Sequence, residues 1–418
     1  GRWPGRSAQN RWWGWSSGFR RRRRVAIWGT FDVDNYGDHL FPRIARRELE
    51  ARVPGVVVDA FSPFGSAHPT RFDDADHPVE AFGEPTDRRL DALADRYDAV
   101  LVGGGELLHL NDPLLRHFYT ADPDELARTQ PSRWFLEGLG PARERRCPVV
   151  WHGLGVPFDY DGEQAARVRT ALARRRWATV RDHASAARLR AVGVSAALEV
   201  EVVPDSGLLV DRLLPPAGRA RRQARLRADG VLPPLGTPAL VLQGCDLLVP
   251  AARHVAAALT PHVIDGGVEP VLLETGRCRR DGDYADALTA AFGPGVPIRR
   301  VPPDAPLEDV IAVLGAAAVV VASSLHAAVT AVAHRRPFVV LNLGAEAKLD
   351  GFGVQAGFEK HVVHRAADLS SALDVVLTQP PDDGHVAALQ SAVDRHFDRL
   401  AAVVAGRSSR PACATDGQ

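Results

Sequence analysis

Short apolar segments alternate with amphipathic segments along most of this chain of 418 residues. The apolar segments are rich in Val, Leu and Ile and end in Gly, Pro or Asp, as in VAIWG, YDAVLVGGG, EVEVVPD and ALVLQG. Such segments are typical of parallel strands that are buried on both faces. Their alternation with helical patterns predicts an α/β fold in which helices cover both faces of a parallel sheet.

The alternation is interrupted at residues 213–238, where Pro, Gly and Arg replace periodic apolar residues. We expect this segment to link an amino-terminal α/β domain at residues 25–212 to a carboxy-terminal one at residues 239–385. A terminal amphipathic helix and a tail are expected at residues 386–418. Two Rossmann-like domains of this size resemble the B-type glycosyltransferase fold, and ligands of such sheets bind at the carboxyl ends of strands.

Residues 1–24 contain eight Arg and four Trp, with no acidic residue and no apolar segment typical of a signal peptide. A disordered arm without function is one interpretation. The other is a basic arm that contacts anionic lipid or polymer, which would place the protein at the inner face of the membrane. The rest of the chain has 43 basic and 51 acidic residues, which argues against a nucleic-acid binder.

The four cysteines are scattered, without a C-x-x-C pair or a histidine at zinc-finger spacing. This pattern favours neither a disulfide framework nor a zinc site, and we expect a protein of the reducing cytoplasm.

Residues 310–333 form an apolar stretch that is long enough to span a bilayer. Against a span, polar residues including His326 fall inside it, and aromatic anchors are missing. The β-branched run at residues 319–321 instead predicts a buried strand, and Ser323 or Ser324 can cap a helix that begins at Leu325. We therefore expect a strand followed by a helix.

His326 would lie in the first turn of that helix, directly after the end of a strand. A single histidine on an apolar helix can be an ordinary core residue. However, free backbone N–H groups and two serine hydroxyls surround this position, and such a place binds anions. We interpret His326 as a site residue, with Ser323 and Ser324 beside it.

Polar side chains and glycines also follow the strands of the first domain. These candidates are Asn35, Asp38, Gly104, Gly105, Glu106, His109 and His152. Bare glycine backbone lets a ligand approach a strand end closely. Three alternatives stay open: Asn35 and Asp38 can be turn and capping residues, the glycines can serve sheet packing, and His152 can be a core histidine.

Three cationic side chains follow strands elsewhere, namely Arg181, Arg277 and Lys348. Guanidinium groups suit carboxylate and phosphate. Arg181 can instead pair with Asp182, which can cap the next helix. A solvated loop would equally explain the arginines around Arg277.

A series of motifs occurs in a specific order between residue 25 and about residue 357: NYGD, LVGGGELLH, HGLGVP, TVRDHASAARLRAVGV, VVPDSGLLV, LEDVIAVLGAAAVVVASSLHAAVTAVAHRRPFVVLN and AKLDGFG. In this order and spacing the chain resembles the polysaccharide pyruvyl transferase family. The resemblance implies a fold like the B-type glycosyltransferases. It also implies that pyruvate is transferred from phosphoenolpyruvate to two hydroxyls of a sugar, forming a cyclic ketal on a cell-surface polysaccharide or its precursor.

The resemblance, combined with the chemistry of phosphoenolpyruvate, suggests roles for the candidates. His326 would act as the acid or as the phosphate partner, and Asp38 would deprotonate the sugar hydroxyl. The donor would be held on the carboxy-terminal side by Ser323, Ser324, Arg181, Arg277 and Lys348. The acceptor, a sugar or a lipid-linked oligosaccharide, would be held by Asn35, Gly104, Gly105, Glu106, His109 and His152. No metal or cofactor is expected besides the co-substrate.

The chain departs from the family at one position, because many members read Arg-Leu-His where it has Ser324, Leu325 and His326. Arg181, Arg277 or Lys348 would then supply the missing charge. Two other functions stay open. A B-type glycosyltransferase would use a nucleotide sugar, for which the segment LETGRCRRDGD is a loose match. A catalytically silent sugar-binding relative would also keep the fold, since fold does not fix function.

Overall fold

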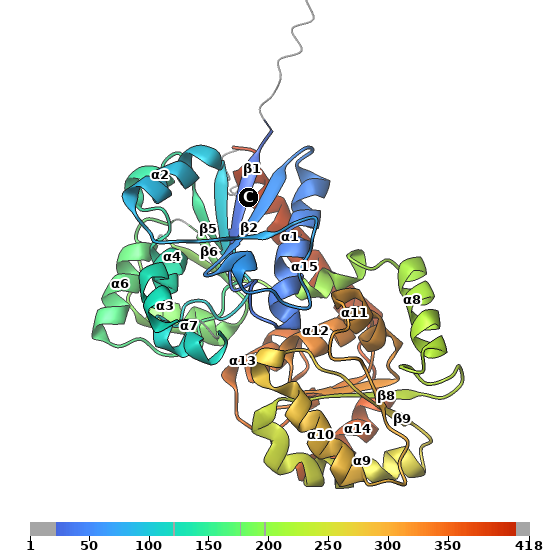
Figure 1. Cartoon of the computed structure of the whole chain (residues 1–418). Helices are drawn as coiled ribbons and strands as arrows, with labels where there is room; N and C mark the ends of the chain where they lie inside the picture. Colours follow the sequence, from blue (N-terminus) through green and yellow to red (C-terminus); the bar gives the residue numbers. More distant parts are fainter. Residues whose placement is uncertain (1–21, 120–121, 176, 196–197, 407–418) are drawn as a thin grey trace, which may run out of the picture.

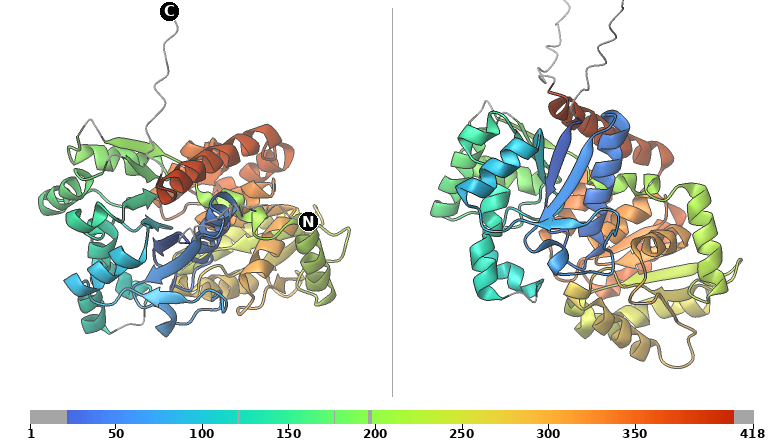
Figure 2. Two further views of the ribbon diagram at one scale, coloured as in Figure 1. Left: turned by 90° about the horizontal axis from the view of Figure 1, so that it is seen from above. Right: turned by 45° about the horizontal axis from the view of Figure 1, so that its top comes forward.

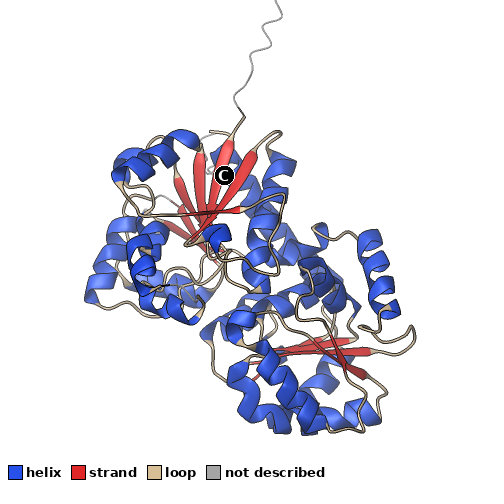
Figure 3. Ribbon diagram, in the orientation of Figure 1, coloured by secondary structure: helices blue, strands red, loops and turns tan. Residues whose placement is uncertain are grey.

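The structure, a computed structural model, describes residues 22–119, 122–175, 177–195 and 198–406. Within these ranges the chain forms two lobes, each built on a parallel sheet with helices on both faces (Figure 1). Figure 3 shows the two separate sheets. The predicted architecture of two parallel-sheet α/β domains is confirmed. Most of the basic arm and the end of the predicted tail lie outside the described residues.

The first lobe contains a five-stranded parallel sheet in the order β3-β2-β1-β4-β5. Its strands are β1 (Arg24–Trp28), β2 (Val57–Ser62), β3 (Val79–Ala81), β4 (Ala99–Gly103) and β5 (Val149–His152), and the parallel pair β6 (Trp177–Val180) and β7 (Glu199–Val202) lies next to β5. Val25 and Ile27 of β1 enter one hydrophobic core, whereas Ala26 and Trp28 enter another. This alternation shows that the central strand is buried on both faces.

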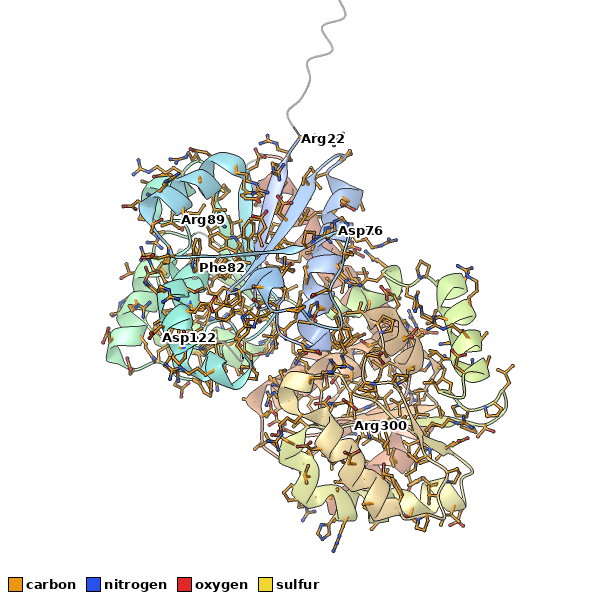
Figure 4. All side chains as sticks on the ribbon, viewed as in Figure 1. Arg22, Asp76, Phe82, Arg89, Asp122 and Arg300 are labelled. Carbon is orange, nitrogen blue, oxygen red and sulfur yellow. The ribbon has the colours of Figure 1, made fainter. Side chains whose placement is uncertain are left out.

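Helices cover both faces of the first sheet. They are α1 (Tyr36–Arg52), α2 (Asp87–Arg96), α3 (Pro123–Thr129), α4 (Pro131–Glu137), α5 (Pro141–Glu144), α6 (Gly162–Leu172) and α7 (His183–Ala191), with short 3₁₀ turns η1 (Gly65–Ala67), η2 (Asp112–His117) and η3 (Ser206–Arg212). On one face Phe82, labelled in Figure 4, stacks on Trp134 with ring centroids 5.1 Å apart. Helix α7 is capped by Asp182, whose side chain accepts a hydrogen bond from Ser185 N, as the sequence indicated.

The second lobe contains a six-stranded parallel sheet in the order β10-β9-β8-β11-β12-β13. Its strands are β8 (Ala239–Gln243), β9 (Glu269–Leu272), β10 (Arg299–Arg300), β11 (Val319–Ala322), β12 (Phe338–Leu341) and β13 (Val362–Val363). Its helices are α9 (Ala252–Ile264), α10 (Asp281–Phe292), α11 (Leu307–Ala316), α12 (Leu325–Ala333), α13 (Ala347–Ala356) and α14 (Leu369–Thr378), with 3₁₀ turns η4 (Asp246–Ala251), η5 (Arg277–Arg279), η6 (Glu359–His361) and η7 (Ala366–Asp368).

The apolar stretch at residues 310–333 is divided among α11, β11 and α12. Ser324 caps α12 by accepting a hydrogen bond from Ala327 N at 3.3 Å. The predicted strand and helix, and the helix start at Leu325, are confirmed. By length and composition alone a different segment, Asp246–Ile264, could cross a membrane. In this fold it forms η4 and α9, and residues such as Val255 and Leu259 are buried in the core of the second lobe.

The segment at residues 213–238, predicted to link the domains, is partly helical. It contains helix α8 (Pro216–Ala228), which packs on α11. Arg222 and Arg225 of α8 pair with the buried Asp309 of α11 at 2.6 Å each. Leu226 is the residue of α8 that is buried, so the helix shows little apolar periodicity in the sequence.

The last helix, α15 (Asp383–Val404), returns from the second lobe to the first (Figure 2). It begins three residues before the predicted terminal segment, with Asp382 as its N-cap. It packs on α1 and η3, and Arg52 of α1 pairs with Asp394 at 2.7 Å. The largest hydrophobic cluster runs from Val25 in the first sheet, through these helices, to Val241 in the second. This continuous core fixes the lobes around the space between their strand ends.

Candidate active site

A cavity of about 570 Å³ lies between the lobes, at the carboxyl ends of β1, β4, β8, β9, β11 and β12. Most of the residues that the sequence singled out line it, namely Asn35, Asp38, Gly105, Glu106, His109, Arg181, Ser323, Ser324, His326 and Lys348. Strand ends therefore bring together residues that are far apart in the chain, as expected for parallel α/β sheets. Gly104, His152 and Arg277 do not line the cavity.

His326 lies in the first turn of α12 and reaches toward the first lobe. Its Nε2 is 3.4 Å from Oδ2 of Asp205, and its ring meets the edge of Phe41 with centroids 5.1 Å apart. A methyl group added to Gly37 would lie only 1.9 Å from His326 Nδ1. Glycine at position 37 therefore makes room for the imidazole between α12 and α1.

Asp38 is in the first turn of α1, but it does not cap the helix. Asn35 is the N-cap and accepts a hydrogen bond from Gly37 N at 2.9 Å, so α1 begins earlier than the sequence suggested. The capping interpretation assigned the cap to Asp38, but the cap is Asn35, which also lines the cavity. The Asp38 carboxylate instead accepts a hydrogen bond from Thr30 Oγ1 at 2.7 Å. Burial raises the pKa of Asp38 to about 6, although the Thr30 hydrogen bond and the charge of His326 oppose the shift.

Another wall of the cavity carries cationic and acidic side chains that form ion pairs with one another. Arg181 Nη2 is 3.2 Å from Glu106 Oε1, and Lys348 Nζ is 2.6 Å from Glu346 Oε2 and 3.6 Å from Glu106 Oε2. Burial alone would raise the pKa of Glu106, but Lys348, Arg181 and Arg279 lower it below its usual value. The side chain of Arg181 is 6% exposed, and its Nε and Nη2 donate no hydrogen bond within the described residues. Its Nε also lies 3.7 Å from Oδ2 of Asp182, so the pairing with Asp182 that the sequence left open is present, and the guanidinium is held on the cavity wall by two carboxylates.

Arg279 lines the cavity, whereas Arg277, one of the predicted donor ligands, does not. Both residues belong to the 3₁₀ turn η5, and two positions of such a turn point in different directions. Arg277 is half exposed and donates to the carbonyl of Pro303 at 2.8 Å. Arg279 Nη2 is 3.6 Å from Glu346 Oε2, and its guanidinium lies 5.5 Å from the ring centre of Phe118.

His152 lies outside the cavity and is a buried core histidine, as its alternative interpretation held. Its Nδ1 is 2.6 Å from Nε2 of His396 on α15, and the two rings are stacked. Burial lowers the pKa of His152 to about 4. Gly104 has a positive φ of 93°, and a methyl group there would lie 2.8 Å from Phe41 Cβ. Gly104 therefore serves close packing beside the cavity rather than lining it.

Gln243, at the end of β8, was not singled out from the sequence. Its Oε1 accepts hydrogen bonds from the N–H groups of Ser323 and Ser324, at 3.1 and 2.8 Å. The sequence suggested that these two N–H groups bind an anion of the ligand. In the structure they bind the side-chain amide of Gln243. Gln243 Nε2 in turn donates to Asp281 at 2.8 Å, and burial raises the pKa of Asp281 to about 6.

One wall of the cavity is apolar. It is formed by Leu114, Leu115, Phe118, Pro157, Phe158 and Leu247. Phe158 of the first lobe is 50% exposed and Leu247 of the second lobe is 60% exposed. Large apolar side chains that stay exposed beside a polar cavity often mark a binding surface. No sequence pattern indicated this wall, because its residues lie in loops and 3₁₀ turns.

Among the described residues no group of His, Cys, Asp or Glu has the arrangement of a metal site. The cavity can thus supply an acid at His326, a carboxylate base at Asp38 and three cations in Arg181, Arg279 and Lys348. Such a set suits transfer of an anionic group to a hydroxyl.

Solved structures with similar folds include an epimerase of UDP-GlcNAc, a glycosyltransferase and a protein in complex with UDP. The UDP-GlcNAc 2-epimerase of Methanocaldococcus jannaschii has a TM-score of 0.57 at 11% identity, covering 91% of this chain and 99% of that chain. A glycosyltransferase of Rickettsia africae reaches 0.56 at 9% identity, covering 93% and 100%. MnaA of S. aureus in complex with UDP reaches 0.53 at 9% identity, covering 93% and 98%. The predicted likeness to the B-type glycosyltransferase fold is confirmed, and at these identities it shows the fold alone.

No curated protein sequence matches the chain. The sequence model of the polysaccharide pyruvyl transferase family matches residues 35–344. This range runs from the N-cap of α1 to the loop after β12 and holds His326, Asp38 and Arg181. The chain belongs to the polysaccharide pyruvyl transferase family.

Proposed function

We propose that the protein transfers pyruvate from phosphoenolpyruvate to two hydroxyls of a sugar, free or lipid-linked, and forms a cyclic ketal on a cell-surface polysaccharide or its precursor. Membership of the family supports a transferase that acts on a sugar or polysaccharide. The observation that carries the choice of donor is the convergence of Arg181, Arg279 and Lys348 on the cavity that holds His326.

The donor carries a carboxylate and a phosphate, which call for several cations in one place. Arg181 is held by Glu106 at 3.2 Å, and Arg279 and Lys348 are held by Glu106 and Glu346 at distances of 2.6 to 3.6 Å. These three side chains supply the charge that Ser324 lacks where many family members have arginine. Ser324 instead caps α12 and so keeps His326 in the first helical turn.

The reaction needs an acid and a base. His326 gives a proton to C3 of the donor, whose double-bond electrons form the new C–H bond and leave a cationic C2. A first sugar hydroxyl attacks C2 and loses its proton to Asp38, which returns it to His326. The C–O bond to phosphate then breaks, and phosphate leaves with the electron pair. The second hydroxyl closes the ketal, and its proton goes to phosphate.

The proposed base predicts an acidic limb in the pH profile. Because burial raises the pKa of Asp38 to about 6, the carboxyl is protonated below that pH and cannot accept a proton. We expect kcat/KM to fall as the pH drops through about 6. The folded state holds this proton more tightly than the unfolded chain, so the same group lowers stability as the pH rises from 3.8 to about 6.

The check is a pH series of initial rates for the wild type and for Asp38→Asn, with unfolding curves at the same pH values. The variant should lose most of its activity and its limb near pH 6. If the residual activity of Asp38→Asn still falls at acidic pH as in the wild type, the acidic limb belongs to another group.

The apolar wall predicts where the acceptor lies. The apolar face of a sugar ring packs well on an aromatic side chain, and Phe158 is half exposed beside the polar part of the cavity. Phe158→Ala should raise the acceptor KM about tenfold, which corresponds to roughly 1.4 kcal/mol. The donor KM should stay unchanged. Leu235→Ala, at an 85% exposed leucine that does not line the cavity, is the matched control in steady-state kinetics with each substrate varied. Equal KM values for Phe158→Ala and wild type would place the acceptor elsewhere.

The proposed function is tested with radiolabelled phosphoenolpyruvate and a panel of simple and lipid-linked glycosides. Label should move to an acceptor while an equal amount of phosphate is released. The product should be unchanged under conditions that reduce free ketones, because a ketal has no free carbonyl group. Parallel reactions contain labelled nucleotide sugars, because the structural neighbours include a glycosyltransferase. Transfer from a nucleotide sugar, with none from phosphoenolpyruvate, would overturn the proposal in favour of glycosyl transfer.

A further inference from the structure

Asp205 is a buried carboxylate next to His326 that the sequence did not indicate as a site residue. It follows β7 and caps the turn η3, where its Oδ1 accepts a hydrogen bond from Gly207 N at 2.8 Å. Its other oxygen, Oδ2, lies 3.4 Å from Nε2 of His326 and accepts no hydrogen bond from the described residues. Asp205 is only 7% exposed. One oxygen therefore serves the backbone, and the other is directed at the imidazole.

The imidazole is held on its other sides as well. A methyl group at Gly37 would lie 1.9 Å from Nδ1, and one at Gly207 would lie 3.9 Å from Cδ2. Phe41 meets the ring at an interplanar angle of 90°. The ring thus has little freedom to rotate, with Nε2 toward Asp205 and Nδ1 toward the first turn of α1, where Asp38 lies.

Electrostatics favour a charged pair. Burial alone would raise the pKa of Asp205, but attraction to His326, the charge of Arg181 and the hydrogen bond from Gly207 N lower it below the usual value. The charged groups around the ring are Asp205, Asp38 on α1, Arg181 after β6 and Lys348 on α13. A buried carboxylate without a partner is costly, and the imidazolium of His326 is the partner in contact.

We infer that Asp205 is a positioning residue for His326, whose carboxylate accepts the Nε2–H hydrogen bond and stabilises the imidazolium, so that Nδ1 carries the proton given to the donor. This assignment of atoms rests on the proposed function. A carboxylate that fixes the tautomer and charge of a catalytic histidine is a known arrangement in other enzymes. In this protein the carboxylate lies 3.4 Å from the imidazole, and both side chains are mostly buried.

The first test needs no substrate. Protein labelled with ¹⁵N in histidine is compared with its Asp205→Asn variant by NMR, and the His326 signals are identified by their loss in His326→Gln. In the wild type at neutral pH, both nitrogens should show the signature of imidazolium. The amide introduced by Asp205→Asn keeps an oxygen for Gly207 N but removes the charge, so in that variant the His326 signals should change to those of a neutral ring.

The second test is kinetic. Asp205→Asn should lower kcat about 10- to 100-fold, a range found when the partner of a functional histidine is removed. The donor KM should stay near that of the wild type. The alkaline limb of its pH profile should move to lower pH, since the acid form is lost earlier. Asp382→Asn is the matched control, because Asp382 caps α15 through His385 N at 2.8 Å and does not line the cavity.

Unchanged His326 signals in Asp205→Asn would overturn the inference, whatever reaction the protein catalyses. A lower kcat with an alkaline limb at the wild-type pH would also overturn it. A purely structural defect would lower the rate by the same factor at every pH and would not shift the limb. If the wild type transfers no pyruvate, the proposed function fails, and the NMR comparison alone decides whether Asp205 holds the charged form of His326.

Discussion

His326→Gln is expected to lower kcat for pyruvyl transfer by roughly 10²- to 10⁴-fold, the range for loss of a general acid. The side chain stands at the start of α12, with its ring between Asp205 and Gly37, and glutamine fits this space without titrating. Because Ser324 still caps the helix, the midpoint of thermal unfolding should change little. The measurement is a rate under saturating substrates combined with an unfolding curve.

His364→Gln provides the control, since His364 is a half-exposed histidine that pairs with Asp350 at 2.8 Å outside the cavity. It should retain the wild-type rate. A wild-type rate in His326→Gln would show that His326 is a packing residue and that the acid lies elsewhere.

Arg181→Gln is expected to raise the donor KM on the order of 100-fold, equivalent to about 2.7 kcal/mol for a lost charged hydrogen-bonding partner. The guanidinium is nearly buried and has two nitrogens without hydrogen bonds in the described part of the chain. Its removal also takes one cationic partner from the Glu106 carboxylate. The free energy of unfolding of the variant must therefore be measured separately. Phosphoenolpyruvate should raise the unfolding temperature of the wild type but not of the variant.

Arg277→Gln tests the specificity of this effect. Arg277 is a half-exposed arginine outside the cavity, and its variant should bind the donor like the wild type. Equal donor affinity in Arg181→Gln and Arg277→Gln would remove Arg181 from the donor site.

The fold was predictable because buried strands leave a strong local pattern. Strand β11 and helix α12 follow directly from the valines at residues 319–321 and the serine cap at Ser324. Helix α8 was missed for the converse reason, since Leu226 is its buried residue and its arginines bind Asp309 from another helix. Periodicity identifies a helix only where the helix buries an apolar face.

The site was predictable only to the level of strand ends. The rule that ligands meet the carboxyl ends of strands brought His326, Asp38 and Arg181 to one cavity. It could not distinguish Arg279 from Arg277, because the geometry of a short 3₁₀ turn decides which of them faces inward. The partner of His152 is 244 positions away in sequence, so nothing local showed that this histidine is stacked in the core.

Because α15 returns to the first lobe, the second lobe is an insertion within the first and not a domain joined by a single linker. The polypeptide passes between the lobes twice, after η3 and again before α15. Two crossings leave fewer degrees of freedom than one tether, and the continuous core from Val25 to Val241 joins the lobes as well. A chimera that exchanges the second lobe must therefore be cut at both crossings, and α15 must stay with the half that carries Asp38.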